Sequence, residues 1–272
     1  MWRIFYESRP TLYYSSMQAK VTRKLGQGSQ WGMTYTWSKA EDIEDNEELG
    51  SPLWNYPAYF SRNKALSGFD RTSVFTTYWL YSLPFGKGQP YLQHGLAGAI
   101  AAGWALSGVL SRLSGTPFTV TDNSGASNLN SPGNQQTPNI VAPIHLTKGR
   151  PYQSPSNCAL GNNSCSYFDI SSFAQVATAA TFGNAGRDII RGPGFFDMDA
   201  TLTRNFKIGE FLTFQFEAQA IGVTNTPHFG NPDSNITDAN FGKVTGETAT
   251  ANSSLGGSGG ERQWWFGGKF IF

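Results

Sequence analysis

The groups of residues that could carry out chemistry are few and incomplete. The segment 256–260 has the sequence GGSGG and formally matches the Gly-x-Ser-x-Gly nucleophile elbow of hydrolases. That elbow needs a strand before it and a helix after it, whereas this Gly/Ser-rich segment leads directly into a strand-like pattern. Asp197 and Asp199 could act as a pair of carboxylates, but polar residues on the wet side of a strand are the favoured interpretation. We therefore expect a protein that is not an enzyme and needs no cofactor.

Cysteine and histidine do not assemble a metal site. Cys158 and Cys165 are the only two cysteines and lie in a segment rich in Ser, Asn and Gly. A zinc site would need two further ligands, and His94, His145 and His228 are scattered along the chain. A loop disulfide formed in an oxidising compartment is the favoured interpretation, and a pair of free thiols is the alternative.

Composition points to a protein whose surface partly meets something other than water. Charged residues make up 14% of the chain, whereas about 25% is usual for soluble domains. Aromatic residues also make up 14% and the net charge is +1, so no basic stripe exists to bind nucleic acid. The low mean hydropathy argues against a helical membrane protein. It does not argue against a β-barrel, whose strands average an apolar and a polar face.

Alternation of apolar and polar residues with a period of two predicts seven strands. The clearest example is the segment 30–38, where Trp31, Met33, Tyr35 and Trp37 alternate with small or polar residues. The predicted strands span residues 12–25, 30–38, 70–83, 103–115, 195–206, 211–225 and 262–272.

The closing segment, 262–272, would place four large aromatic side chains on one face of a strand: Trp264, Phe266, Phe270 and Phe272. Trp265 and Ile271 are exceptions on the opposite face. The segment has the length of a transmembrane β-strand, which needs about 9–11 residues. Such a face must be buried against another sheet or against lipid.

The connections between the predicted strands alternate in length. Short or moderate connections (26–28, 84–102 and 207–210) follow the odd-numbered strands, and long ones (about 40–68, 116–194 and 226–261) follow the even-numbered strands. Transmembrane β-barrels have short periplasmic turns and long extracellular loops. We therefore predict an all-β fold, an antiparallel transmembrane β-barrel. Residues 116–194 should form a structureless connection outside the barrel. The polar loop 40–68, whose six acidic residues lack the spacing of a calcium loop, should be solvated.

In a barrel the apolar faces would meet lipid and the polar faces would meet the lumen. An Arg substitution at Met33 or Phe214 should then block membrane assembly, whereas Gln215→Arg should be tolerated. The residues expected to face the lumen are Gln30, Thr34, Thr36, Asp197, Asp199, Gln215, Glu217, Gln219 and Lys269.

Seven strands do not complete a barrel, because single-chain bacterial barrels have an even number of at least eight strands and lipid tolerates no open edge. The chain should therefore be part of a larger sheet or should oligomerise. Residues 1–7 lack the apolar core of a signal peptide. If the mature protein lies outside the cytoplasm, we expect that the chain has lost its true beginning.

Several short stretches occur in a fixed order along the chain: residues 35–39 (YTWSK), 69–71 (FDR), 83–88 (LPFGKG), 103–108 (GWALSG), 114–118 (SGTPF), 186–194 (GRDIIRGPG), 224–230 (TNTPHFG) and the terminal Phe272. With these stretches, the chain from Tyr13 onward resembles the C-terminal barrel region of Oar-like TonB-dependent outer-membrane receptors. No single stretch is decisive, but their common order is specific.

The resemblance implies a location in the outer membrane of a Gram-negative bacterium. It implies the last seven strands of a 22-stranded barrel, without the plug and the N-terminal segment that contacts the TonB complex. The parent protein would import an unidentified large solute of the siderophore, glycan or peptide class. Trp264, Phe266, Phe270 and Phe272 would form the signal that the barrel-assembly machinery recognises, by addition of an edge strand.

An alternative from another class is a secreted β-sandwich that binds carbohydrate through exposed aromatic residues such as Trp31 and Trp37. A soluble module of this kind would stay monodisperse without detergent, whereas a membrane barrel would not. A complete barrel assembled from several copies would instead form a discrete oligomer in detergent.

Overall fold

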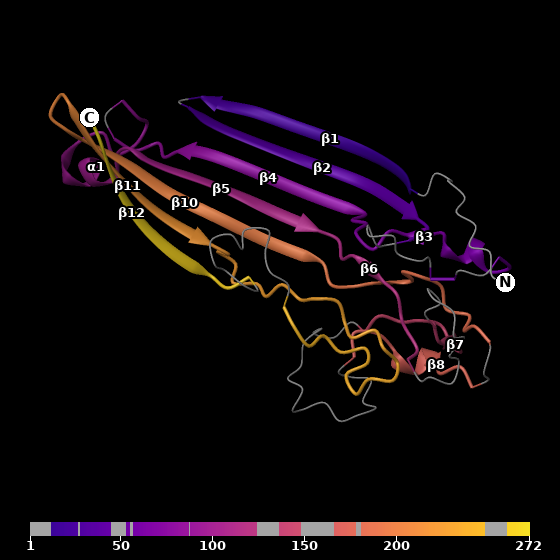
Figure 1. Cartoon of the computed structure of the whole chain (residues 1–272). Coiled ribbons are helices and arrows are strands. Elements are labelled where there is room, and N and C mark those ends of the chain that lie inside the picture. The colour runs from indigo at the N-terminus through magenta and orange to yellow at the C-terminus, as the bar shows by residue number, and fades with distance from the viewer. Residues whose placement is uncertain are drawn as a thin grey trace.

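Seven long strands form one antiparallel sheet in the computed structural model (Figure 1). The structure describes residues 12–26, 28–44, 53–54, 57–86, 88–123, 136–147, 166–177, 181–247 and 260–272. The long strands are β1 (Leu12–Gly26), β2 (Ser29–Asp42), β4 (Ser73–Ser82), β5 (Trp104–Leu113), β10 (Phe195–Ile208), β11 (Leu212–Ile221) and β12 (Gln263–Ile271). They lie side by side in chain order, so the predicted antiparallel arrangement is confirmed.

The ends of the strands follow turn chemistry and side-chain contacts. Gly26 and Gly28 have φ values of 86° and 78° at the turn between β1 and β2, a conformation that glycine adopts without strain. The strand predicted from residue 70 begins at Ser73, because the Asp70 carboxylate accepts a hydrogen bond from the backbone N–H of Ala40 at 2.6 Å. The strand predicted to reach residue 225 ends at Ile221, because Gly222 turns the chain with a φ of 60°.

The two ends of the sheet carry different connections. The short turns after β1 and β10, the β4–β5 connection and the C-terminus lie at one end, which we call the short-turn end (Figure 1). The three long connections lie at the other end. The β4–β5 connection contains a helix, α1 (Gly95–Ala101), where the sequence predicted only a connector. No helix in the described part of the chain is long and apolar enough to cross a membrane.

The described parts of the long connections are folded, so the prediction that residues 116–194 are structureless is wrong for the residues that the structure describes. Short strands form in them: β3 pairs with the end of the long strand β2, and β6 pairs with β9 and β7 with β8. We call the described parts of the three long connections the loop assembly. Its short elements are η1 (Phe60–Asn63), β3 (Ala65–Leu66), β6 (Pro117–Phe118), β7 (Asn139–Ile140), η4 (Ile170–Ser172), β8 (Phe173–Ala174) and β9 (Ile190–Arg191).

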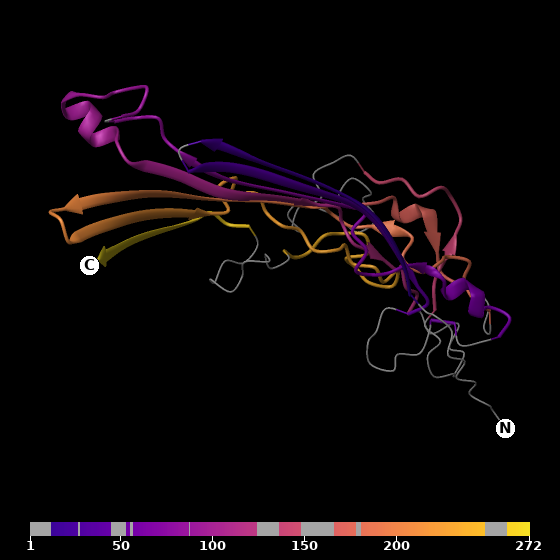
Figure 2. The same ribbon diagram turned by 90° about the horizontal axis from the view of Figure 1, so that it is seen from above.

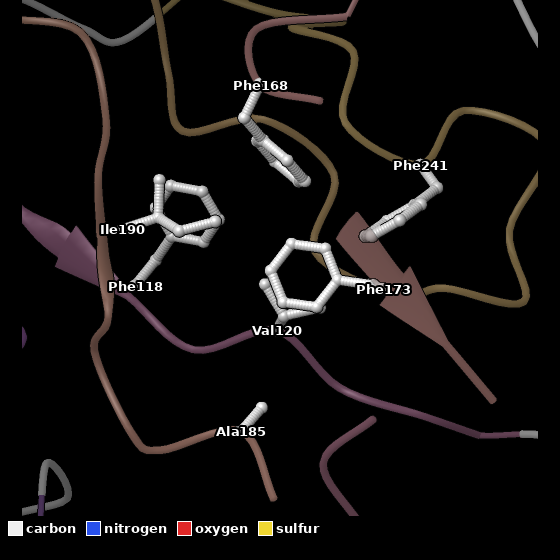
Figure 3. Close-up of a cluster of buried hydrophobic side chains, with 7 residues drawn as sticks. All are labelled: Phe118, Val120, Phe168, Phe173, Ala185, Ile190 and Phe241. Carbon is white, nitrogen blue, oxygen red and sulfur yellow. The ribbon is translucent and has the colours of Figure 1, made fainter. Parts of the chain in front are cut away.

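The loop assembly has a hydrophobic core of its own (Figure 3). Phe168 is fully buried, and its ring centroid lies 5.7 Å from that of Phe173 and 5.4 Å from that of Phe241. Edge-to-face aromatic pairs of this kind stabilise beyond the area that they bury. The core consists of Phe118, Val120, Phe168, Phe173, Ala185, Ile190 and Phe241. Phe241 comes from the β11–β12 connection and the other residues from the β5–β10 connection, so this core joins two of the long connections.

The sheet has two open edges. β1 pairs only with β2, and β12 pairs only with β11, among the residues that the structure describes. The two edge strands lie on opposite sides of the sheet (Figure 1), so these seven strands do not close into a barrel. They form one sheet rather than two packed sheets, and the β-sandwich alternative therefore does not describe this chain.

Candidate functional site

The register of the sheet places the predicted luminal residues on one face. Cross-strand partners lie on the same face of a sheet, and the register can be followed from strand to strand: Thr34 opposes Thr76, Thr76 opposes Ser111, and Ser111 opposes Asp197. We call this the polar face. It carries Gln30, Thr34, Thr36, Asp197, Asp199, Gln215, Glu217, Gln219 and Lys269. That this face lines a lumen remains a prediction.

The opposite face, which we call the apolar face, brings together hydrophobic residues from all seven strands. The register joins Val21 to Met33, Thr77 to Leu110, and Leu110 to Met198. Many of these side chains are exposed among the residues that the structure describes, and Phe266 is 71% exposed. Transferring such surface from water to an apolar environment is favourable by about 25 cal/mol per Å². An uncovered face of this size marks a surface that meets another apolar phase.

Charged residues avoid the middle of the apolar face. Arg23, Lys39, Glu41 and Arg112 lie within four residues of a strand end, and Arg204 lies opposite Trp104, the first residue of β5. On the polar face, Lys20 lies in the middle of β1. A cation at the bilayer midplane costs about 2–4 kcal/mol, and the cost falls to about 0–1 kcal/mol near the interfaces. The charges are therefore arranged as lipid on the apolar face requires.

Aromatic residues lie at both borders of the uncharged band of the apolar face, and some, such as Tyr35 and Phe216, also lie within it. Trp104, Phe206, Phe214 and Phe270 lie toward the short-turn end. Trp37, Phe75, Phe196 and Trp264 lie toward the long connections. Aromatic girdles at both borders are a feature of transmembrane β-barrels, because ring systems suit the boundary between lipid and water.

A buried ion pair ties the long connections to the sheet. Arg187, from the β5–β10 connection, donates to the Asp42 carboxylate and to the Asp42 backbone carbonyl, the latter at 2.8 Å. The two side chains are 3% and 7% exposed, and Arg187 also lies 3.5 Å from the Asp188 carboxylate. Asp42 ends β2, so this contact fixes the second long connection against the first hairpin.

Two further arginines, Arg191 and Arg71, join the β5–β10 connection to the β2–β4 connection. Arg191 binds the Asp70 carboxylate and donates to the Gly115 carbonyl at 3.0 Å. Conversely, Arg71, from the β2–β4 connection, donates to the carbonyl of Ser114 in the β5–β10 connection at 2.6 Å. Burial lowers the pKa of the Arg71 guanidinium, and the positive charge of Arg191 lowers it further. Its ordinary pKa is so high that the group stays protonated at neutral pH.

The acidic connection between β2 and β4 is not simply solvated, which corrects the sequence-based expectation. Trp54 and Asn63 are fully buried. The backbone N–H of Trp54 donates to the Asn63 side-chain carbonyl, and the Asn63 amide NH₂ donates to the Trp54 backbone carbonyl, both at 2.9 Å. Arg62 lies over the Trp54 ring at 4.3 Å and donates to the Gly183 and Ala185 carbonyls at 2.9 Å and 3.0 Å. Burial lowers the pKa of the Arg62 guanidinium.

The remaining predicted site residues fall in three groups. Asp197 and Asp199 each accept a backbone N–H at 2.9 Å, from Met198 and Gly222. Trp264, Phe266 and Phe270 lie on the apolar face of β12, and Phe272 follows its end and is exposed. Cys158, Cys165, the acidic residues Asp45, Glu47 and Glu48, and all but Gly260 of the segment 256–260 lie outside the described residues. The described residues contain no cluster of three metal-binding side chains.

The arginine contacts of the loop assembly were not predicted. Arg71, Arg187 and Arg191 lie in the stretches that carry the resemblance to known receptors, and Arg62 lies outside them. One signal was available, since arginine and aspartate stand out in a chain with only 14% charged residues. Their pairing joins residues 121 and 145 positions apart, and such distant partners cannot be identified from a single sequence.

The sheet, its two faces and the uneven connections define a class of protein, the β-barrels of outer membranes. A family model described as an outer membrane beta barrel domain matches residues 5–264. The chain belongs to this family, and its place is therefore the outer membrane. Comparison with curated proteins and with solved structures found no match.

Proposed function

We propose that this chain is the C-terminal barrel portion of an Oar-like TonB-dependent receptor that imports a large solute of the siderophore, glycan or peptide class. The observation that carries the proposal is the pair of open edges on a sheet with an exposed apolar face. The resemblance of the seven motif stretches and of Phe272 to such receptors supports the finer assignment. Its role is transport rather than catalysis.

The open edges require further strands. In lipid, each unpaired backbone N–H or C=O costs several kcal/mol, because no water is present to replace the missing partner. β1 has 15 residues and β12 has 9 residues, and each offers one unpaired side. Additional strands of the same protein would satisfy both sides and would complete an even-numbered barrel.

The two ends of the sheet give the proposed direction. The short-turn end, with the C-terminus, would lie in the periplasm, and the loop assembly would lie outside the cell. The polar face would line the pathway of the solute. A plug and a TonB-contacting segment would be supplied by other parts of the protein. β12, with Trp264, Phe266 and Phe270 exposed, would present the edge that the barrel-assembly machinery binds.

The mass of the native protein tests whether the sheet continues within one polypeptide. The chain described above has a mass of 29.7 kDa. An antibody against the loop assembly should detect, in isolated outer membranes, a heat-modifiable polypeptide several times larger. A polypeptide of the same mass that forms a discrete oligomer in detergent would contradict the proposal and would favour a barrel made of several copies.

Uptake by whole cells tests the transport function. The gene for this chain and the gene for TonB are deleted separately, and accumulation of labelled ferric siderophores, oligosaccharides and peptides is compared. One class of solute should fail to accumulate in both strains, because energised import needs both proteins. Unchanged uptake of all three classes in the first strain would refute the receptor assignment.

A further inference from the structure

The helix α1 is attached to the apolar face of the sheet at the short-turn end. The Trp104 indole N–H donates to the Ile100 carbonyl at 2.9 Å, and the Arg204 guanidinium donates to the carbonyls of Ala99 and Ile100. Trp104 and Arg204 oppose one another in the register, so both belong to the apolar face. Figure 2 shows the helix (magenta) beside the end of the sheet where the C-terminus lies.

The attachment uses the ring system of the apolar face as well. The Arg204 guanidinium carbon lies 5.3 Å from the centroid of the Trp104 ring and 4.3 Å from that of the Phe206 ring. An arginine that lies over aromatic rings is held in place by cation–π attraction. The last carbonyls of a helix, which have no partner within it, are favourable acceptors for a cation.

The outer side of α1 is apolar and uncovered. Leu96 is 84% exposed and Ile100 is 67% exposed, and residues four positions apart lie on the same side of a helix. Gly98 points the opposite way and is buried, since a Cβ added there would lie 2.3 Å from the Leu92 carbonyl oxygen. The helix is therefore fixed with Leu96 and Ile100 directed away from the protein.

The neighbouring residues have the same character. Tyr91 and Leu92 are exposed, and the segment 91–102 contains no Asp, Glu, Lys or Arg. If this connection faced only water, it would be expected to be polar. An uncharged segment with a tyrosine, in contact with the border of an apolar face, suits the boundary between lipid headgroups and acyl chains.

We propose that α1 is an interfacial helix that inserts Leu96 and Ile100 into the membrane leaflet next to the short-turn end. Leu96 and Ile100 would contact phospholipid, and the inserted helix would continue the lipid-facing surface of the sheet. Arg204 is the positioning residue, because it joins the end of the helix to Trp104 and Phe206. The inference rests on the proposed lipid exposure of the apolar face.

Site-specific depth measurement tests this placement. A single cysteine is introduced by Leu96→Cys, Met33→Cys or Glu210→Cys into protein that carries Cys158→Ser and Cys165→Ser. The protein is purified from the outer membrane with its whole chain and labelled with an environment-sensitive fluorophore. It is reconstituted in phosphatidylethanolamine/phosphatidylglycerol vesicles that carry a nitroxide quencher either near the headgroup or near the end of the acyl chain.

The three positions have different expected results. The Leu96 probe should be quenched about twofold more strongly by the shallow quencher than by the deep one, since interfacial helices lie about 5–10 Å into the headgroup boundary. The Met33 probe should respond to the deep quencher, and the Glu210 probe, at a turn of the same end, should respond to neither. Quenching at Met33 without quenching at Leu96 would overturn the inference alone. Absence of quenching at Met33 would instead refute the lipid exposure of the apolar face.

The variant Arg204→Met tests the positioning role. It keeps most of the side-chain bulk and removes the donors to the Ala99 and Ile100 carbonyls. Shallow quenching at Leu96 should fall about twofold as the helix leaves the interface, while quenching at Met33 stays unchanged. Unchanged quenching at Leu96 would show that Arg204 does not hold the helix.

Discussion

The sheet and the loop assembly place their hydrophobic residues in opposite ways. On the sheet, Met17, Trp37 and Phe266 are exposed, and no second layer in the described part of the chain covers them. In the loop assembly, Phe168 and Val120 are fully buried and belong to the same hydrophobic cluster (Figure 3). The difference shows that the two regions suit different surroundings. The sheet needs an apolar phase against its exposed face, whereas the loop assembly buries its apolar side chains in a hydrophobic core of its own.

The two regions also use charge differently. On the apolar face of the sheet, the cations lie only at the borders of the uncharged band, where a charge facing lipid costs little free energy. The loop assembly buries Arg187 with Asp42, a pair whose partners offset each other's loss of hydration only while both are present. Damage to the core or to the ion pair should therefore affect the loop assembly, and a new charge in the band should affect the sheet.

The largest local effect is expected from Phe168→Ala. Removal of a fully buried Phe ring costs about 3–5 kcal/mol, and this loss should appear as much faster hydrogen exchange throughout the loop assembly. Amides of the β10–β11 ladder should keep their protection. Leu146→Ala, at a half-exposed position of the same connection, serves as the control and should change little. Equal loss of protection in the ladder would mean that the two regions form one cooperative unit.

Arg187→Met should destabilise the loop assembly by about 3 kcal/mol, because it leaves the Asp42 and Asp188 carboxylates buried without this cation. Limited proteolysis of the detergent-solubilised protein should then cleave the long connections much faster. The matched control is Lys39→Met, which removes an exposed pair with Glu41, 2.9 Å apart, and should change stability by less than about 1 kcal/mol. Similar rates for both variants would contradict a stabilising role of the buried pair.

Met33→Arg should prevent stable insertion of the sheet. It places a cation in the uncharged band, at a cost of about 2–4 kcal/mol, and the protein should lose its heat-modifiable form on gels. Gln215→Arg makes the same change on the polar face, opposite Lys269, and should leave assembly intact. If the two variants behaved alike, the assignment of the faces would be wrong.

Phe214→Arg should have a smaller effect than the sequence alone suggested. Phe214 opposes Phe206 and Phe270 near the short-turn end, where an arginine costs only about 0–1 kcal/mol. The fraction of heat-modifiable protein should therefore lie between those of Met33→Arg and Gln215→Arg. A block as complete as that of Met33→Arg would show that the apolar band extends beyond this end.

The strands and their faces could be predicted because the signal is local. Trp31, Met33, Tyr35 and Trp37 alternate with polar residues within one segment, and the pleat of a strand turns this alternation into two faces. The alternating lengths of the connections are also a property of the linear chain. The ends of the strands were less accurate, as at Ser73 and Ile221, because they depend on contacts with Asp70 and on the turn at Gly222.

The loop assembly could not be predicted because its signal is distributed. Phe118, Phe168 and Phe241 stand apart in segments rich in Asn, Ser and Gly, without a helical or strand period. Only the folded chain brings them within 5.4 Å to 6.1 Å of one another in successive ring pairs. The same holds for the helix α1, whose lipid-directed side follows from its attachment to Arg204.

By itself, the sequence determined that this protein builds two-faced strands with short turns at one end, because alternation, glycine turns and spacing are written along the chain. Only the tertiary structure decided that the described parts of the long connections fold and that Arg187 meets Asp42. Both outcomes depend on partners far apart in the chain, 145 residues in the case of Arg187 and Asp42, and the free energy of such contacts exists only once the chain has brought them together.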